Sequence, residues 1–129
     1  MGHSVTIATK HPQYGSFNWN GVDVVEGLNI DLMAEFTKRF DYIITLWDIW
    51  RIAAASFPRE KWVAYVPISS ESVGQDLEQT LSGTSTQIAM SRHGEKAMNE
   101  VGISPIYAPH GIDTSVFTIK PDGRANFRA

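Results

Sequence analysis

The stretch TQIAMSRHGEKAMNEVGISPIYA, Thr86–Ala108, decides the fold class. It opens with a short apolar strand pattern, and Ser91 is then expected to cap a helix that runs to Val101. Gly102 stands where helices commonly end, and Ser104–Ala108 is predicted as a second strand. A strand, a helix and another strand at this spacing are typical of a parallel βαβ unit.

The same alternation extends upstream of this unit. Strands are predicted at Tyr42–Trp47 and Lys61–Ile68, with an alanine-rich helix at Ile49–Phe57 and a weaker helix at Ser72–Leu81. Tyr42–Trp47 is apolar throughout, as in a strand that is buried on both faces. We therefore expect an α/β fold, a three-layer α/β/α Rossmann-like sandwich with a mostly parallel sheet and helices on both of its faces.

The first forty residues add a strand, a hairpin and a helix. Ser4–Thr9 alternates as a strand does and is expected to join the same sheet. Ser16–Gly27 is predicted to form a small β-hairpin insertion that turns at Asn20-Gly21, the strongest short hairpin signal. Asn29–Phe40 is expected to form a helix that its first residue caps.

Size and composition fit one globular domain. The chain has 129 residues, of which 43% are hydrophobic and 19% charged. Its net charge of −3 gives no reason to expect nucleic acid as a partner. The absence of cysteine excludes disulfides and thiolate metal sites, and no run of 18 apolar residues predicts a transmembrane segment. With no leader pattern at the start, we expect a cytoplasmic location.

Polar residues follow the predicted strands. In open parallel sheets, ligands bind beyond the carboxyl ends of the strands, so these residues are the candidates for a substrate-binding rim. The candidates are Asp48, Ser69, Ser70, Ser91, Arg92, His110 and Gly111.

Each candidate has a structural alternative. Asp48 either contacts a ligand or caps the next helix, and Ser91 either marks an anion-binding helix N-terminus or is an ordinary cap. Gly94, inside the first turn of that helix, costs about 1 kcal/mol relative to alanine, which suggests that something needs the room. His110 either orients a hydroxyl or phosphate group or is structural, and Asp113 is expected to cap the turn that follows it.

The apolar pair Val116-Phe117 is expected to anchor this turn by packing.

The common catalytic motifs are missing. The sequence has neither classical phosphate loop, no G-x-S-x-G nucleophile elbow and no H-E-x-x-H metal motif. The residues alone therefore indicate an α/β domain with a polar rim at its strand ends and no complete catalytic set.

The segment SRHGEKAMNEVGISPIYAPHGIDTSVF, Ser91–Phe117, resembles the end of the N-terminal domain of retaining glycosyltransferases of the GT-B fold, family four. Members of that family typically read SRFGEKALREAGV…YVPHGVDTEVF at this place. GHSVTIAT, which begins at Gly2, is similar to their second strand, and FDYIITLWDIW and WVAYVPI are similar to their middle strands. The resemblance covers nearly the whole chain and is most specific over Ser91–Phe117.

The resemblance implies that residues 1–118 form a Rossmann-like, acceptor-side domain that lacks its first strand and first helix. Residues 119–129 would then be a linker toward a donor-binding domain that is absent here. The full enzyme would transfer a hexosyl group from a nucleotide-sugar to the hydroxyl of an acceptor sugar or glycoconjugate, with retention and without a metal. The fragment alone would bind no cofactor and be inactive, and His110 is the best candidate for a catalytic residue.

One departure from the family pattern concerns the loop Pro67–Glu71. Many relatives carry an aspartate or histidine there that reaches into the cleft, whereas this sequence reads PISSE.

The alternative to an enzyme is a non-catalytic α/β module that binds a ligand or self-associates. A sheet and helix surface built to meet a missing first strand or a missing second domain should leave apolar area exposed, so we expect a homo-oligomer, and specifically a two-fold dimer.

Overall fold

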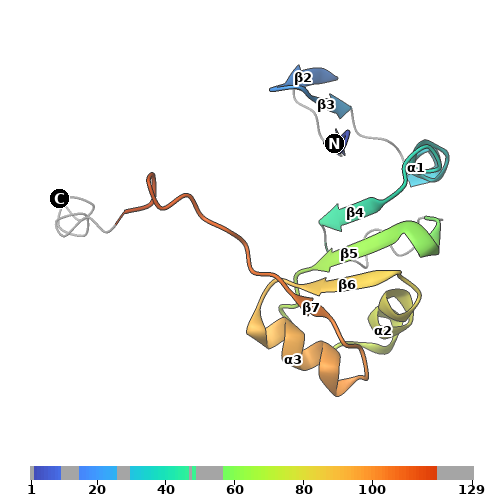
Figure 1. Cartoon of the computed structure of the whole chain (residues 1–129). Coiled ribbons are helices and arrows are strands. Elements are labelled where there is room, and N and C mark those ends of the chain that lie inside the picture. The colour runs from blue at the N-terminus through green and yellow to red at the C-terminus, as the bar shows by residue number, and fades with distance from the viewer. Residues whose placement is uncertain (1, 10–14, 26–29, 47, 49–56, 119–129) are drawn as a thin grey trace.

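The computed structural model describes residues 2–9, 15–25, 30–46, 48 and 57–118. They form a mixed α/β structure with two separate sheets (Figure 1). The larger sheet has four strands in the order β4-β5-β6-β7, and every neighbouring pair is parallel. Its strands are β4 (Ile43–Leu46), β5 (Trp62–Val66), β6 (Thr86–Ala89) and β7 (Ile106–Tyr107). The predicted parallel sheet is confirmed for these four strands.

Helices connect the later strands of this sheet. α2 (Gln75–Ser82) leads from β5 to β6, and α3 (Arg92–Glu100) leads from β6 to β7. A 3₁₀ turn, η2 (Arg59–Lys61), precedes β5. The predicted Ser91 cap and the helix end before Gly102 are confirmed, because Ser91 is the N-cap of α3 and Gly102 has a φ of 81°. The helix predicted at Ile49–Phe57 falls, apart from its last residue, outside the described residues.

One face of the larger sheet forms the core. Its side chains, which we call the covered face, are Ile43, Trp62, Ala64, Val66 and Ala89. They pack with Leu81 of α2 and with Ala97 and Met98 of α3. β5, β6 and β7 lie side by side in chain order. Crossovers between parallel strands are right-handed almost without exception, so two crossovers that step in the same direction place α2 and α3 on the same face.

The opposite face carries apolar side chains without such a cover. Its members, which we call the open face, are Ile44, Leu46, Val63, Tyr65, Ile88 and Ile106, as the strand registers show. The first two and the last are strongly exposed, and the other three are half-buried. Within the described part of the chain, the helices therefore contribute to the core on the covered face, and a second helical layer is not seen.

The smaller sheet consists of β1 (Thr6–Ala8), β2 (Phe17–Trp19) and β3 (Val22–Val25), in the order β1-β3-β2. β2 and β3 form the predicted hairpin, and its turn residues Asn20 and Gly21 both have positive φ angles. The expectation that β1 joins the larger sheet is wrong. β1 forms its ladder in parallel with β3, so the hairpin belongs with β1 and is not an insertion into the larger sheet.

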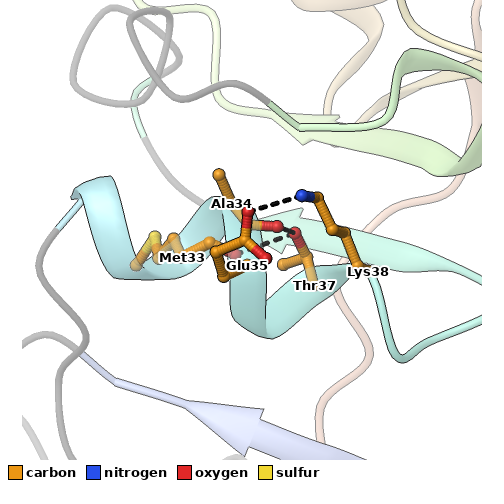
Figure 2. Close-up of polar contacts among 5 residues, drawn as sticks. All are labelled: Met33, Ala34, Glu35, Thr37 and Lys38. Atoms are coloured by element: carbon orange, nitrogen blue, oxygen red, sulfur yellow. Dashed lines mark hydrogen bonds and ion pairs between the residues drawn. The ribbon is translucent and has the colours of Figure 1, made fainter.

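The helix α1 (Ile30–Thr37) lies between the two sheets in the chain and is shorter than predicted. Figure 2 shows how its last turn closes, with Thr37 Oγ1 donating to the carbonyl oxygens of Met33 and Ala34 at 2.8 and 3.1 Å. Such a side-chain bond back to the preceding turn competes with continued helix formation. Met33 packs against the core, and Lys38 pairs with Glu35 at the surface.

Candidate functional site

The carboxyl ends of β5, β6 and β7 lie next to one another because these strands are parallel neighbours. The segments that leave them are the loop after Val66, the N-terminus of α3 at Ser91 and the segment that follows Tyr107. Most of the predicted rim residues therefore occur along one edge of the sheet. Asp48 follows the adjacent strand β4 and, like Ser69, is exposed.

Side-chain contacts join the loop after β5 to the start of α3. His93 Nε2 donates to the carbonyl oxygen of Ser70 at 2.8 Å, and Ser70 Oγ donates to the carbonyl oxygen of Ser72 at 2.8 Å. Because a carbonyl oxygen only accepts, the imidazole of His93 carries its hydrogen on Nε2 in this contact. His93 thus fixes the loop that contains two of the predicted binding residues.

Ser91 acts as a helix cap in this structure. Its Oγ accepts a hydrogen bond from the backbone N–H of Gly94 at 3.0 Å, which satisfies one of the free amides of the first turn. Gly94 is buried, and an added Cβ would lie 3.3 Å from Ser91 Oγ and 3.4 Å from Ile68 Cβ. The room that this glycine leaves is therefore taken by Ile68 and the cap, which is a packing reason for the glycine.

Arg92 is held by two neighbours. Its guanidinium forms an ion pair with Glu95 at 2.7 Å, and its Cζ lies 3.7 Å from the centre of the Tyr107 ring. The hydrogen bond to Glu95 raises the pKa of Arg92 above its ordinary value, so the group stays charged. The guanidinium is oriented at the rim while its side chain stays largely exposed.

His110 lies on the other side of the sheet edge. Its ring meets the ring of Tyr65 edge-on, with 5.2 Å between centroids, and Tyr65 Oη donates to the carbonyl oxygen of Ala108 at 2.8 Å. Tyr65 belongs to the open face, whereas Tyr107 beneath Arg92 is in register with Ala89 of the covered face. The predicted residues thus form two groups. Ser70 is joined through His93 to the start of α3, which carries Ser91 and Arg92, whereas His110 contacts Tyr65.

Tyr65 is a rim residue that the sequence analysis did not identify. Its position one residue before the end of a half-buried strand, with a polar tip on an apolar ring, is the signal that was available. Gly111 is exposed, and a Cβ added to it would meet nothing within 4 Å, so neither packing nor backbone geometry demands a glycine there.

The turn after His110 agrees with prediction in one respect and not in another. Asp113 Oδ1 accepts hydrogen bonds from the backbone N–H and the hydroxyl of Ser115, so the predicted cap is confirmed. These bonds lower the pKa of Asp113 below its ordinary value. The expected packing anchor is wrong, because Val116 and Phe117 are both exposed on a segment that leaves β7 and runs away from the sheet (Figure 1).

The rim supplies imidazole, guanidinium, hydroxyl and phenol groups, which suit hydrogen bonding to a polar ligand. Among the described residues, no cluster of three or more histidine, aspartate or glutamate side chains is arranged to hold a metal ion. Helices α1, α2 and α3 have eight or nine residues each, too few for any helix of the described chain to cross a membrane.

Comparison with models of known protein families, with curated proteins and with solved structures finds no match.

Proposed function

We propose that this chain is the acceptor-side domain of a retaining, metal-independent glycosyltransferase of the GT-B type. The full enzyme would transfer a sugar from a nucleotide-sugar donor to an acceptor hydroxyl. The proposal rests on the resemblance of Ser91–Phe117 to that family and on one structural observation, the place where the sheet is interrupted.

β1 is an edge strand of the smaller sheet, and β4 is an edge strand of the larger sheet. Each of these strands has a ladder partner on one side only, β3 for β1 and β5 for β4, among the residues described. In a doubly wound Rossmann fold the strand order is 3-2-1-4-5-6, so the first strand lies between the second and the fourth. If β1 is the second strand of such a fold and β3 the third, the first strand belongs between the edge strands β1 and β4, and the hairpin strand β2 lies outside β3.

The open face supports the same interpretation. In a doubly wound sheet the winding direction reverses at the first strand, and the helix that follows this strand covers the face that later helices leave bare. The exposed side chains of Ile44, Leu46 and Ile106 lie on that face. A Rossmann-like, three-layer domain from which one strand and one helix are missing explains both the interruption and the open face.

The rim would bind the acceptor. Ligands of such folds bind beyond the strand ends near the point of reversal, which here is next to β4. Asp48, Ser69, Ser70 and Arg92 would hydrogen-bond acceptor hydroxyls, and His110, oriented by Tyr65, would contact the reacting region. Closure against a donor-binding domain would exclude water and so protect the donor from hydrolysis.

The test is a chain extended at both ends. The flanking coding sequence is read for a strand, a glycine-rich loop and a helix upstream, and for a donor-binding domain downstream. The extended protein is then assayed with nucleotide-sugars and simple glycosides, with the product anomer read by NMR. We expect retained configuration, no turnover by the 129-residue chain alone, and a lower kcat for His110→Ala than for the exposed-histidine control His3→Ala. Turnover of any nucleotide-sugar by the isolated chain contradicts the proposal.

A self-associating module is the second candidate, and the open face favours it. An apolar face of this kind is commonly an interface in soluble proteins. An isolated chain that forms a stable dimer, together with flanking sequence that encodes no strand, helix or donor domain, would support this candidate over the enzyme.

A further inference from the structure

A pocket away from the strand-end rim lies at the smaller sheet. It has a volume of about 340 Å³. Its lining comes from the smaller sheet, from Ser16 just before β2, from Phe36 of α1 and from Arg39 in the turn after α1. The lining residues are Thr6, Ser16, Phe17, Asp23, Val24, Val25, Phe36 and Arg39. This size is at the lower end of the range for small-molecule sites, and the lining combines apolar residues with an equal number of polar or charged ones.

Asp23 is a lining residue of this pocket, and the hairpin orients its carboxylate. The backbone N–H of Gly21 donates to Asn18 Oδ1 at 3.0 Å, which fixes the amide so that its Nδ2 donates to Asp23 Oδ1 at 2.8 Å. The hairpin turn therefore orients the carboxylate through Asn18. The second carboxylate oxygen of Asp23 has no hydrogen-bond partner recorded among the described residues.

Arg39 is a second charged lining residue, and it contacts two aromatic rings. Its Cζ lies 4.6 Å from the centre of the Phe36 ring and 5.8 Å from that of Phe40, and the two rings contact each other. A guanidinium that stacks on aromatic rings keeps its N–H edge available for a planar, two-pronged acceptor such as a carboxylate. The ion pairs recorded among the described residues include none between Arg39 and Asp23.

An acidic and a basic residue thus line one small pocket, each in contact with its own neighbours, and the described residues show no ion pair between the two. A ligand with a single charge would leave one of them without a counterpart, whereas a ligand with both charges matches both. Val25 and Phe36 offer an apolar wall beside these charges.

We propose that this pocket binds a free α-amino acid as its zwitterion, with the carboxylate on Arg39, the ammonium on Asp23 and an apolar side chain against Val25 and Phe36. The proposal is independent of the proposed transferase activity, since it uses none of the rim residues.

Isothermal titration of the 129-residue chain tests this with three probes. L-Leucine carries both charges, L-leucinamide lacks the carboxylate, and 4-methylpentanoate lacks the ammonium. We expect leucine to bind at least about tenfold more tightly than either analogue, because charge-assisted hydrogen bonds are the stronger kind. Absence of leucine binding at millimolar concentration, or equal affinity for 4-methylpentanoate, overturns the proposal.

Variants assign the two charges. Arg39→Gln should abolish the preference for leucine over leucinamide, and Asp23→Asn the preference for leucine over 4-methylpentanoate. Arg39→Lys, which keeps the charge but loses the fork, should weaken leucine binding by a smaller factor. Lys38→Gln is the matched control, because Lys38 pairs with Glu35 at the surface and does not line the pocket (Figure 2). Amide NMR shifts on leucine addition should centre on Thr6 and Asp23, and shifts at Ser91 and His110 instead would contradict the site.

Discussion

The two faces of the larger sheet carry similar side chains but have very different surroundings. The covered face joins Leu81 and Met98 of the helices in a core where both are fully buried. The open face has aliphatic side chains of the same kind, yet Ile44 is 69% exposed. The difference shows that hydrophobicity along a strand sets which residues favour burial, while the direction of winding decides which face the chain itself can bury.

The largest expected difference between the faces is in the cost of removing a leucine. Leu81→Ala should lower the free energy of unfolding by about 2–5 kcal/mol, because it leaves a cavity in a packed core. Leu46→Ala should change it by less than about 0.5 kcal/mol, because that side chain is 61% exposed. Urea unfolding of both variants at low protein concentration makes the comparison. Equal losses would mean that the open face is covered in solution.

The next test asks whether a second copy of the chain covers the open face. We expect the wild type to form a two-fold dimer, because an exposed, contiguous apolar face is commonly an interface. Ile44→Lys should weaken the dimer at least about tenfold, since a charge placed in an apolar interface must be desolvated. Light scattering over a range of concentrations measures this, with Gln79→Lys, at an exposed residue of α2, as the control for added charge. A wild type that is monomeric at high concentration rules out this dimer.

Local sequence signals made the strand–helix–strand unit that packs on the covered face predictable. Thr86–Ala108 folds nearly as expected because a cap at Ser91, a helix-ending Gly102 and apolar periodicity all agree. The pairing of β1 was not predictable in the same way. Alternation predicts that a strand exists, but its ladder partner depends on edges contributed by distant segments.

In the candidate site, too, contacts between residues close in sequence were predictable, whereas packing partners distant in sequence were not. The cap at Asp113 was predicted because it depends on residues two to four positions away. The anchor at Val116 and Phe117 failed because apolar character does not specify a partner to pack against. The contact of Tyr65 with His110 depends on segments forty-five residues apart, so only the fold brings it about.

A smaller loss of stability is expected from a change at the start of α3, the helix that packs on the covered face. Ser91→Ala should cost about 1 kcal/mol of unfolding free energy, because the amide of Gly94 loses its acceptor. Ser91→Asp should restore most of it, since aspartate caps as well and favours the positive end of the helix. Thermal unfolding compares them with Ser69→Ala, an exposed serine of the neighbouring loop. If Ser69→Ala costs as much as Ser91→Ala, the capping interpretation fails.

The smallest expected effect lies beyond β7, where neither face of the sheet contributes packing. Asp113 accepts two hydrogen bonds from Ser115, and these lower the pKa of its carboxyl below the ordinary value of about 3.9. Because the pKa of the folded turn is the lower one, the turn gains stability above the ordinary value and loses it as pH falls through the folded-state pKa. Carboxyl NMR should show a depressed midpoint for Asp113, and Ser115→Ala should move it back upward, because the variant lacks the hydroxyl that donates the shorter of the two bonds. A midpoint at the ordinary value in both proteins would show that this turn does not persist in solution.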